Sequence, residues 1–532
     1  MNEGRSLWAW GLEAREPSQA DFEVAARTLS ARYGVSLKAA TAPDCSAISL
    51  RKPRARPPAA LASFCSTSDR DRVLHSYGHS FPDRVRKFMG MFDNPSDVVA
   101  YPRTEPEVSA VLDWASGANA VVIPFGGGSS VVGGVTPPAG GERVITLDTT
   151  ALSRVLDVDV TSRAARVQAG ALGPGIESQL KPHGLTLRHF PQSFEFSTLG
   201  GWIATRSAGH YATNQTHIED FVESLRMVAP AGLWESRRLP GSGAGPNPDR
   251  FVAGSEGILG IITEAWMRVQ GIPKYRESAS ITFPSFAAAS EAARTIVQAK
   301  LWPANCRVLD EGEAAAAAGM DGRRSLLVLG FESSDVPQDG FMVEAISMAR
   351  AAGGEISDGA IGPTGTEHNS NARLGPAAIW RKSFIEMPYS WNAMLGLGLI
   401  NDTFETAVTW DRWPGFHEHV RSAVLHALKR VCGGGTVTCR FTHVYPDGPA
   451  PYFTFVGLGR RGSELEMWAE IQAAASDAVV TAGGTITHHH AVGRDHRPGY
   501  DAERPPLFAS ALRAAKQVLD PRSVLNPGVL ID

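Results

Sequence analysis

The chain is poor in cysteine and in long apolar runs, and each shortage excludes a class of protein. Among 532 residues there are five cysteines, at positions 45, 65, 306, 432 and 439, and none forms a CxxC pair. An odd number of widely spaced thiols neither indicates a disulfide scaffold nor supplies the ligand spacing of a zinc site. No segment approaches the roughly 20 consecutive apolar residues of a membrane-spanning helix. Reduced thiols and no transmembrane segment are therefore expected.

Excess charge is also missing, because 51 basic residues stand against 55 acidic ones and leave a net charge of -4. A nucleic-acid-binding chain would show a large positive field, so no nucleic-acid partner is expected. The opening MNEGRSLWAWGLEAREP lacks the apolar run of a secretory signal, which favours a cytoplasmic protein. A hydrophobic content of 43% and a charged content of 20% are typical of a folded globular chain.

The alternation of strand-like and helix-like stretches along the sequence predicts a mixed α+β protein. From residue 98 to 268, short β-branched runs separated by glycine alternate with helical intervals such as EVSAVLDWASGA. Farther along, SASITF and SLLVLGFE are strand-like, and AAASEAARTIVQAKL is helix-like. The alanine-rich stretch 313–319 predicts a surface helix. Near the end, TITHHH is strand-like and precedes a final helix, FASALRAAKQVL.

The first chemical signal is the glycine-rich stretch Pro124–Ser130, PFGGGSS, which follows the apolar strand AVVI. Consecutive glycines allow positive φ angles and present backbone N–H groups at close range, as a pyrophosphate cradle requires. A glycine-rich strand connection explains this stretch alone equally well. No GK[ST] follows, and Val131 stands where the Rossmann fingerprint needs its third glycine.

Two further stretches shift that balance. Residues 193–206 combine hydroxyl groups with small side chains, so a flat ring system can approach the backbone and still find hydrogen-bond donors. Residues 254–264, GSEGILGIITE, run from a glycine turn into a strand-like segment. Three patches of this kind in one region indicate a large cofactor.

The motifs also carry a resemblance to a known family. PFGGGSS, FEFSTLGGW, GSEGILGIITEA, THHHAVG and LDPRSVLNPGVL occur in the order seen in flavoproteins of the vanillyl-alcohol oxidase type. The chain resembles alkyldihydroxyacetonephosphate synthases and their bacterial homologues in particular, over roughly residues 85–532. The resemblance implies a two-subdomain PCMH-type FAD-binding domain at 93–272, after a helical and loop segment at 1–92. It further implies an α+β cap domain at 273–480 and a segment at 481–532 that returns to the flavin.

The resemblance also implies which residues contact FAD. Aspartate is usual in the family where Gln192 stands, so one polar contact is expected to differ. No histidine or cysteine lies in residues 124–134, where related enzymes attach the flavin, so noncovalent FAD is expected, with His210 and His217 as the remaining attachment candidates. The implied contacts are Pro124, Phe125, Gly126, Gly127, Gly128, Ser129, Ser130, Gln192, Ser193, Ser197, Thr198, Gly201, Thr205, Arg206, Ser207, Ala208, Glu256, Gly257, Leu259, Gly260, Ile261 and Ile262.

Three consecutive histidines, His488, His489 and His490, form the second chemical signal. On a strand, the first and third would share one face. Metal ligation and an exposed structural tract are both rival interpretations, but no HExxH pattern or cysteine lies nearby, and no metal is predicted. The resemblance assigns the three an active-site role together with His189 and Tyr452, because histidine and tyrosine can exchange protons beside a flavin.

Two arginines and one tryptophan are expected to decide the substrate. Arg307 and Arg440 match family arginines and can bind a carboxylate or phosphate by paired hydrogen bonds. The synthases have Tyr-x-Arg-Asp, with a substrate-contacting arginine, where this chain reads Tyr389-Ser-Trp-Asn392. The loss of that charge at Trp391 predicts a substrate other than that of the ether-lipid reaction and less charged.

The expected function is therefore that of an FAD-dependent enzyme acting at the flavin N5 on a small or lipid-like substrate. One hypothesis is synthase-type exchange of an ester-linked group, without net oxidation. The alternative is a dehydrogenase or oxidase of a 2-hydroxy acid or a specialised metabolite. A non-enzymatic flavin-binding protein is disfavoured by the retained histidines and tyrosine. The resemblance also implies a homodimer.

Overall fold

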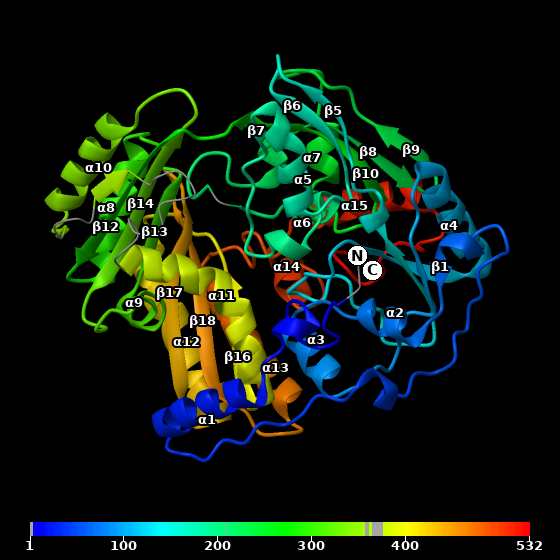
Figure 1. Ribbon diagram of the computed structural model, residues 1–532, viewed down its shortest axis with the longest axis horizontal. Coiled ribbons are helices and arrows are strands. Elements are labelled where there is room, and N and C mark those ends of the chain that lie inside the picture. Colours follow the sequence, from blue (N-terminus) through cyan, green and yellow to red (C-terminus); the bar gives the residue numbers. More distant parts are fainter. Residues whose placement is uncertain (1–3, 210, 357–360, 364–375) are drawn as a thin grey trace.

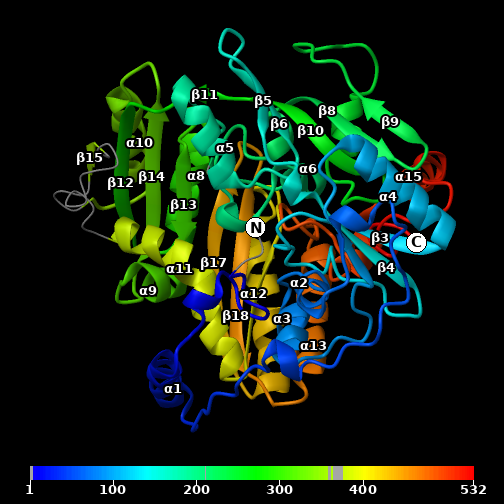
Figure 2. The same cartoon turned by 45° about the vertical axis from the view of Figure 1, so that its right-hand side comes forward.

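The computed structural model describes residues 4–209, 211–356, 361–363 and 376–532 (Figure 1). His210, one of the candidate attachment residues, lies outside them. The fold is a mixture of helices and strands, as expected, with the four strand groupings β1-β2-β4-β3, β5-β6-β10-β8-β9, β11-β7 and β15-β12-β14-β13-β17-β18-β16. Figure 2 shows the large sheet on one side of the molecule and the four- and five-stranded sheets on the other.

The four-stranded sheet carries the glycine-rich loop. Its strands are β1 (Cys65–Ser66), β2 (Val98–Ala100), β3 (Ala120–Phe125) and β4 (Arg143–Asp148), and β4 pairs in parallel with β2 and β3. A parallel pair needs a crossover, which α4 (Glu105–Ala118) supplies between β2 and β3. The hydroxyl of Thr104 caps this helix by accepting from the N–H of Glu107, and Asn119 ends it in the left-handed conformation.

The second sheet of this half is antiparallel and adjoins the other two glycine-rich patches. Residues 254–264 run into its central strand, and residues 193–206 include a helix that packs on it. Its strands are β5 (Val155–Asp159), β6 (Ala164–Gln168), β8 (Val222–Ala229), β9 (Gly232–Glu235) and β10 (Ile261–Arg268). A core of buried apolar side chains joins them to α5 (Gly173–Leu180), α6 (Leu199–Thr205) and α7 (Pro248–Val252). The short strands β7 (Leu185–Thr186) and β11 (Gln270–Gly271) pair beside it.

The C-terminal segment returns to this half of the molecule. It contains α14 (Arg497–Glu503) and α15 (Pro506–Leu519). The N–H of Val122 in β3 donates to the carbonyl of Val524 over 2.7 Å, and the N–H of Asn526 donates to the carbonyl of Val122 over 2.9 Å. The end of the chain therefore pairs directly with the strand that leads into the glycine-rich loop.

The large antiparallel sheet forms the other half. Two N-terminal helices lie near it, α1 (Gln19–Tyr33) and α3 (Phe81–Phe88), while α2 (Asp69–Leu74) lies by β2. Its strands are β12 (Tyr275–Phe283), β13 (Asn305–Leu309), β14 (Ser325–Ser333), β15 (Ile361–Pro363), β16 (Leu399–Glu405), β17 (Gly435–Val444) and β18 (Pro449–Leu458), and its helices are α8 (Phe286–Gln298), α9 (Glu311–Ala318), α10 (Asp339–Ala351), α11 (Pro376–Gly396), α12 (Trp413–Cys432) and α13 (Glu464–Thr481).

The two faces of this sheet differ in chemistry, because alternate side chains of a strand point to opposite faces. One face is apolar: Cys306 and Val308 of β13 and Cys439 and Phe441 of β17 lie in the core that includes α8, α10, α12 and α13. The residues between them face the side covered by α9 and α11, where Arg307 and Arg440 are found. The pairing of Arg440 with Tyr452 in the β17–β18 ladder places a polar group in the middle of this second face.

Two expected elements differ in detail. The alanine-rich stretch is the helix α9, but Ala314, Ala317 and Ala318 are buried under α11, so only part of it lies at the surface. Residues 485–490 do not form a strand, for a reason given with the site below.

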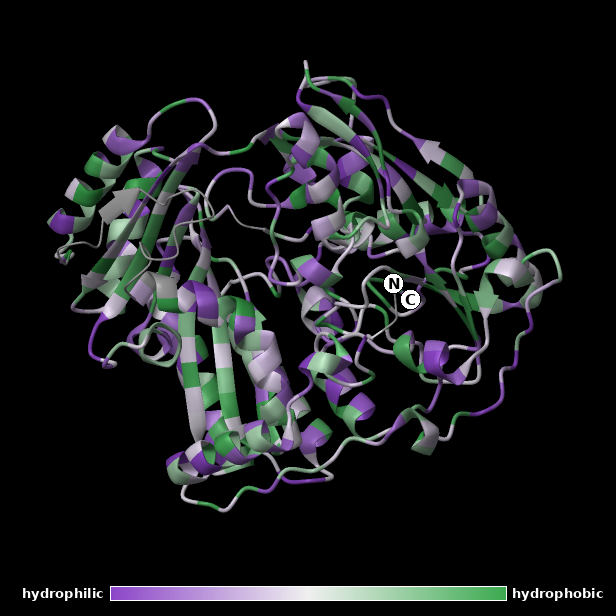
Figure 3. Ribbon diagram, in the orientation of Figure 1, coloured by the Kyte–Doolittle hydropathy of each residue, from purple (hydrophilic) through white to green (hydrophobic). Residues whose placement is uncertain are grey.

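Hydropathy differs between the helices and the strands of the large sheet. In Figure 3 the helices carry hydrophilic and hydrophobic positions along the same ribbon, whereas hydrophobic positions recur along the strands of the large sheet. Within the described part of the chain, none of the helices has the length and apolar character needed to cross a membrane.

Candidate active site

A cavity of about 300 Å³ connects the two halves of the molecule. At one end it is lined by the glycine-rich loop and by α6, and at the other by the polar face of the large sheet together with α11. The three patches that predicted a large cofactor therefore share one space with Tyr452, His489 and His490, three of the residues expected to perform chemistry.

The glycine-rich loop has the geometry of an anion cradle. Gly128 has a φ of +67°, and a Cβ at Gly127 would lie 1.5 Å from the carbonyl oxygen of Phe196, so the loop could not pass there with a side chain. The N–H groups of Gly127, Gly128 and Ser129 donate to none of the described residues. The hydroxyl of Ser130 instead supports the loop, by accepting from the N–H of Gly134 over 2.9 Å.

Side-chain hydrogen bonds hold the other two glycine-rich patches in place. Thr198 caps α6, its hydroxyl accepting from the N–H of Gly201. Glu256, at a φ of +47°, accepts from the N–H groups of Val492 and Gly493 over 2.9 and 2.8 Å. Burial raises the pKa of Glu256 to about 7, against the lowering effect of these two hydrogen bonds. This carboxyl group therefore ties the returning C-terminal segment to the cavity wall.

Of the residues expected to contact FAD, two do not line the cavity. Arg206 turns away, and its guanidinium forms an ion pair with Glu219 at 2.7 Å. Leu259 is fully buried in the apolar core below the wall. The cavity is lined by Pro124, Phe125, Gly126, Gly127, Gly128, Ser129, Ser130, Gln192, Ser193, Ser197, Thr198, Gly201, Thr205, Ser207, Ala208, Glu256, Gly257, Gly260, Ile261 and Ile262.

These features fit a flavin dinucleotide. The N–H groups of the loop, which have no acceptor among the described residues, can donate to a pyrophosphate. Gly200 and Gly201 of α6 line the cavity with backbone alone, so a flat ring can approach this helix. The side-chain amide of Gln192 is directed elsewhere, since its Nε2 donates to the carbonyl of Phe384 over 2.7 Å.

The opposite end of the cavity is cationic and aromatic. The Cζ of Arg440 lies 4.1 Å from the centre of the Tyr452 ring, and the Tyr452 hydroxyl donates to Oγ1 of Thr403 over 2.9 Å. Nη1 of Arg440 pairs with Glu313 at 2.5 Å, whereas its Nε and Nη2 have no partner in the described structure, although the residue is only 1% exposed. Nη1 of Arg307 donates to the carbonyl of Thr442. Burial raises the pKa of Tyr452, and the charge of Arg440 opposes that rise.

The three histidines are arranged around one carboxylate rather than on a strand. Glu405 accepts from the N–H groups of His488, His489 and His490 over 2.7, 3.1 and 2.8 Å, and from the hydroxyl of Thr487 over 2.6 Å. The expected strand is therefore wrong, because the backbone N–H groups bond to a side chain and not to a neighbouring strand. His489 and His490 line the cavity, and His488 does not.

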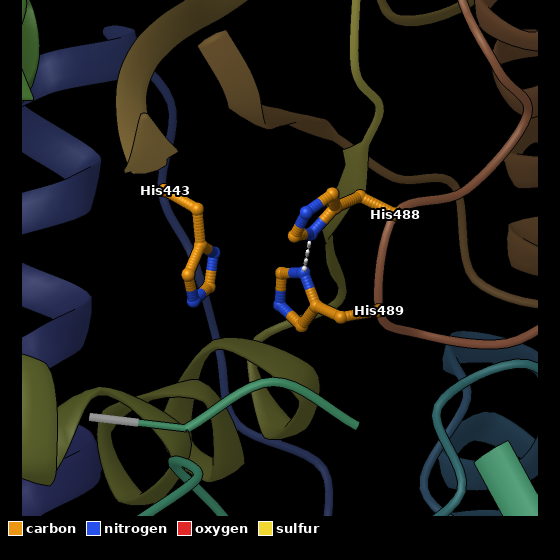
Figure 4. A group of neighbouring side chains, drawn as sticks. All are labelled: His443, His488 and His489. Carbon is orange, nitrogen blue, oxygen red and sulfur yellow. Dashed lines mark hydrogen bonds between the residues drawn. The ribbon is translucent and has the colours of Figure 1, made fainter. Parts of the chain in front are cut away.

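A fourth histidine, His443 of β17, completes a cluster with His488 and His489, shown in Figure 4. Their ligand nitrogens all lie within 4.8 Å of one another, so the three could offer nitrogen ligands to a metal. His488 is already bonded at both nitrogens, to the hydroxyl of Tyr445 at 2.7 Å and to Nδ1 of His489 at 3.0 Å. This connected chain of titratable groups favours a proton network, and the absence of a metal stays a prediction.

Neither His189 nor His217 is placed for contact with a ligand. Nε2 of His189 lies 3.0 Å from the hydroxyl of Ser207, behind the cavity wall, and burial lowers its pKa to about 3. Nε2 of His217 lies 2.9 Å from the carbonyl oxygen of His488. His189 thus does not line the cavity, and its active-site role stays a prediction.

Several lining residues had not been expected. Trp10, His79 and Arg84 reach the cavity from the N-terminal segment, and His443 reaches it from β17. Glu405 holds the histidines although it does not line the cavity. Nothing in the local sequence marks the first three, because their role depends on a long-range contact between the N-terminal segment and α11.

Comparisons with known proteins agree with this geometry. Residues 96–236 match the family described as FAD binding domain, and residues 272–530 match the family described as FAD linked oxidases, C-terminal domain. The alkyldihydroxyacetonephosphate synthase of Dictyostelium discoideum is 30% identical over 474 residues, covering 86% of this chain and 77% of that protein. Glycolate oxidase subunit GlcD of Bacillus subtilis is 25% identical over 480 residues, covering 87% of this chain and 92% of that protein.

Solved structures show the same architecture. An alkyldihydroxyacetonephosphate synthase structure superposes with a TM-score of 0.77 at 25% identity, covering 94% of this chain and 90% of that one. A structure of p-cresol methylhydroxylase shares the fold, with a TM-score of 0.68 at 14% identity over 89% of this chain and 95% of that one. The chain belongs to the FAD-linked oxidase family and is an FAD-dependent flavoenzyme related to the alkyldihydroxyacetonephosphate synthases.

Proposed function

We propose that the protein acts beside a noncovalently bound flavin on a small or lipid-like substrate that carries an anionic group. The observation that supports this proposal is the single cavity joining an anion cradle, the loop Gly126–Ser130, to the face that holds Tyr452, His490 and Arg440. When bound, FAD would supply the acceptor and donor of an electron pair at its N5. The chain's own residues would then bind the anion, orient the reacting carbon and move a proton.

Tyr452 is the proposed proton carrier. Tyr452 lines the cavity, and its raised pKa keeps the hydroxyl protonated near neutral pH, so it can donate to a leaving oxygen. His490 lies with its ring centre 5.3 Å from that of Tyr452. Burial lowers the pKa of His490 to about 3, so the imidazole stays neutral near neutral pH and can accept a hydrogen bond. The pair thus offers a donor and an acceptor in one place.

The arginines are proposed to hold the anionic group. Arg440 has two N–H-bearing nitrogens without partners in the described structure, on the side of the guanidinium not used by Glu313. A guanidinium with two free donors can bind a carboxylate or phosphate by paired hydrogen bonds. Arg307 lines the same part of the cavity. An anion placed there would lie close to Tyr452.

The reaction class has two candidates. Exchange of an ester-linked group is favoured by the 30% identity to synthases, whereas net oxidation of a 2-hydroxy acid is favoured by the similarity to glycolate oxidase subunit GlcD and to a D-lactate dehydrogenase. The ring of Trp391, which lines the cavity where the resemblance puts a substrate arginine, argues against the ether-lipid reaction itself.

An anaerobic experiment separates the candidates. The purified holoenzyme is mixed with acyl-dihydroxyacetone phosphate and hexadecanol, and separately with glycolate and D-lactate, while the flavin spectrum and the products are followed. Lasting bleaching by a 2-hydroxy acid would establish the oxidation. Product exchange without lasting bleaching would establish the synthase type, and efficient ether formation would refute the argument from Trp391.

Noncovalent attachment is tested on the same preparation. The described residues of the loop 124–134 include no histidine or cysteine. Acid precipitation should therefore release the yellow colour into the supernatant. Colour that stays with the precipitate would contradict noncovalent binding, and a colourless protein that FAD does not reconstitute would contradict the cofactor.

A further inference from the structure

A buried arginine from the N-terminal segment lies against Trp391. Arg84, on α3, lines the cavity and is only 5% exposed. Its Cζ lies 5.2 Å from the centre of the Trp391 ring. A guanidinium at this distance from an indole face gains a cation–π attraction that holds it in place. The position that lacks the expected cation is thus occupied by a ring that supports another cation.

The guanidinium of Arg84 is incompletely partnered. Nη2 donates to the carbonyl of Asn401 over 3.1 Å, and Nε has no hydrogen-bond partner among the residues described. The nearest carboxylate oxygen, Oδ1 of Asp402, is 3.9 Å away. The other oxygen of Asp402 accepts from Nε1 of Trp468 over 2.7 Å. A buried charge with donors to spare is costly unless a ligand completes it.

Asn392, the other residue of this stretch that differs from the synthase motif, also contacts the N-terminal segment. Asn392 is buried, and its side chain binds the backbone of Trp10 in both directions: Oδ1 accepts from the N–H over 2.9 Å, and Nδ2 donates to the carbonyl over 3.2 Å. Trp10 itself lines the cavity. Trp391 and Asn392, where the synthases have arginine and aspartate, therefore hold two lining residues of the N-terminal segment.

We propose that Arg84 is a substrate-binding residue, which supplies from α3 the anion-binding charge that Trp391 lacks. Together with Arg307 and Arg440 it makes this end of the cavity a receptor for a carboxylate or phosphate group. The charge requirement on the substrate is then retained, whereas the Trp391 ring changes the shape of the space beside it. This inference rests on the function proposed above and extends it to the substrate class.

The test measures anion binding to the holoenzyme through the flavin difference spectrum. Three probes are titrated: dihydroxyacetone phosphate, glycolate and neutral dihydroxyacetone. Wild-type protein should respond to at least one anion and not to the neutral probe, and the stronger anion tells phosphate from carboxylate. Arg84→Met should weaken that binding by about ten- to a hundredfold, the usual cost of removing a hydrogen bond to a charged group. Arg84→Lys should recover part of it.

Two variants separate this role from a structural one. Arg86→Met removes a guanidinium from the same helix whose side chain does not line the cavity, so it should leave anion binding within about twofold. Arg84→Met combined with Trp391→Arg returns a cation to the motif and should restore binding.

The outcomes are distinct. Loss in Arg84→Met with recovery in the double variant supports the inference. Unchanged anion affinity in Arg84→Met, with the flavin spectrum intact, overturns it and leaves the flavoenzyme function standing. Absence of any anion response in wild type also overturns it, and the substrate assays above then decide the proposed function separately.

Discussion

The hydroxyl of Tyr452 is the single group whose removal should affect turnover most cleanly. Its ring packs against Arg440, so replacement by phenylalanine keeps the packing and removes only the hydroxyl group, with its hydrogen bond to Thr403. We expect Tyr452→Phe to retain FAD and to lose about 10²–10⁴-fold in rate, the scale of a lost general acid. Stopped-flow flavin reduction, or product formation, measures it. A rate near that of wild type would show that the proton moves elsewhere.

The glycine cradle allows a second test at the scale of one atom. A methyl group at Gly127 would meet the carbonyl of Phe196 at 1.5 Å, so Gly127→Ala must shift the loop. Overpacking of this kind costs about 1–3 kcal/mol, and here it would displace the backbone N–H groups that form the cradle. The purified variant should therefore carry less flavin, measured as the ratio of visible to ultraviolet absorbance. Gly175→Ala, where a methyl group meets nothing within 4 Å, is the control and should keep full occupancy.

Some residues of this site could be identified from the sequence, and others could not. The loop 124–130 was readable because its chemistry depends on backbone freedom, which glycine encodes locally. Tyr452 and the histidines were identified through the resemblance. Arg84 was not, because the four charged residues of α3 look like a solvated face. Only the packing of the helix against α11 and α13 buries three of them, Asp83, Arg84 and Lys87.

At the scale of elements, one carboxylate shapes the whole histidine segment. Glu405, at the end of β16, is fully buried and receives the backbone N–H groups of residues 488–490. Burial alone would raise its pKa, but the neighbouring His489 holds the pKa well below its usual range. The ionised group thus fixes a segment that has no strand partner. The pattern TITHHH predicted a strand because a sequence period cannot show that a distant side chain takes the place of a neighbouring strand.

Neutralising this carboxylate should misplace the histidines. Glu405→Gln replaces one acceptor oxygen by an NH₂ group, which cannot accept from the backbone, and leaves at least one N–H unpaired at a cost of about 1–3 kcal/mol. We expect a loss of turnover of at least about tenfold with FAD still bound. Turnover and flavin content are measured together. If activity survives in full, the segment is held by other contacts.

A matched control lies at the start of the same segment. Glu503, on α14, accepts from the N–H of Ile486 over 2.7 Å and from the hydroxyl of Thr485 over 3.0 Å, away from the histidines. Glu503→Gln makes the same chemical change to a tether of the same loop. It should leave turnover within a few-fold of wild type, so that an equal loss in both variants would mean general loosening rather than histidine placement.

At the scale of the whole molecule, the order of strands and helices was predictable from the sequence. The contacts between the two halves of the molecule were not. Alternating apolar and polar positions on β13 and β17 follow from the period of a strand, and they explain why one face became core. Which groups lie opposite the polar face depends on the path of residues 4–92 and 481–532 across the molecule. Those paths place Trp10, Arg84 and His490 in one cavity, and no local pattern encodes them.

Burial of many histidines predicts how the stability of the whole molecule depends on pH. Burial lowers the pKa of His189 and His490 to about 3 and of His417 to about 4, and it holds the pKa values of His79, His443 and His488 well below the usual range. The unfolded chain would protonate these groups as pH falls through about 6.5, and the folded chain would not. Their contribution to stability is therefore present above about pH 6.5 and is lost as the pH falls.

Buried carboxyl groups with a raised pKa oppose this trend, and three of them have the largest shifts. Burial raises the pKa values of Glu256, Asp310 and Asp495 to about 7, so the folded chain binds their protons at a higher pH than the unfolded chain does. Their contribution is lost as pH rises toward 7. Because three carboxyl groups are shifted this far against six histidines, the unfolded chain should bind more protons in sum between about pH 5 and 6.5, and the free energy of unfolding should fall on acidification.

His189 allows this balance to be tested at one residue outside the cavity. Urea unfolding of the holoenzyme, with excess FAD, should give a free energy that falls between pH 6.5 and 5 by at least about 1.4 kcal/mol per pH unit, the value for one net proton. His189→Gln removes a buried imidazole and should make that slope shallower by about the same amount, whatever its effect on the absolute stability. His419→Gln, which replaces an exposed histidine on α12, should leave the slope as it is. A flat profile in wild type, or an unchanged slope in His189→Gln, would show that these imidazoles are protonated in the folded protein as readily as in the unfolded chain.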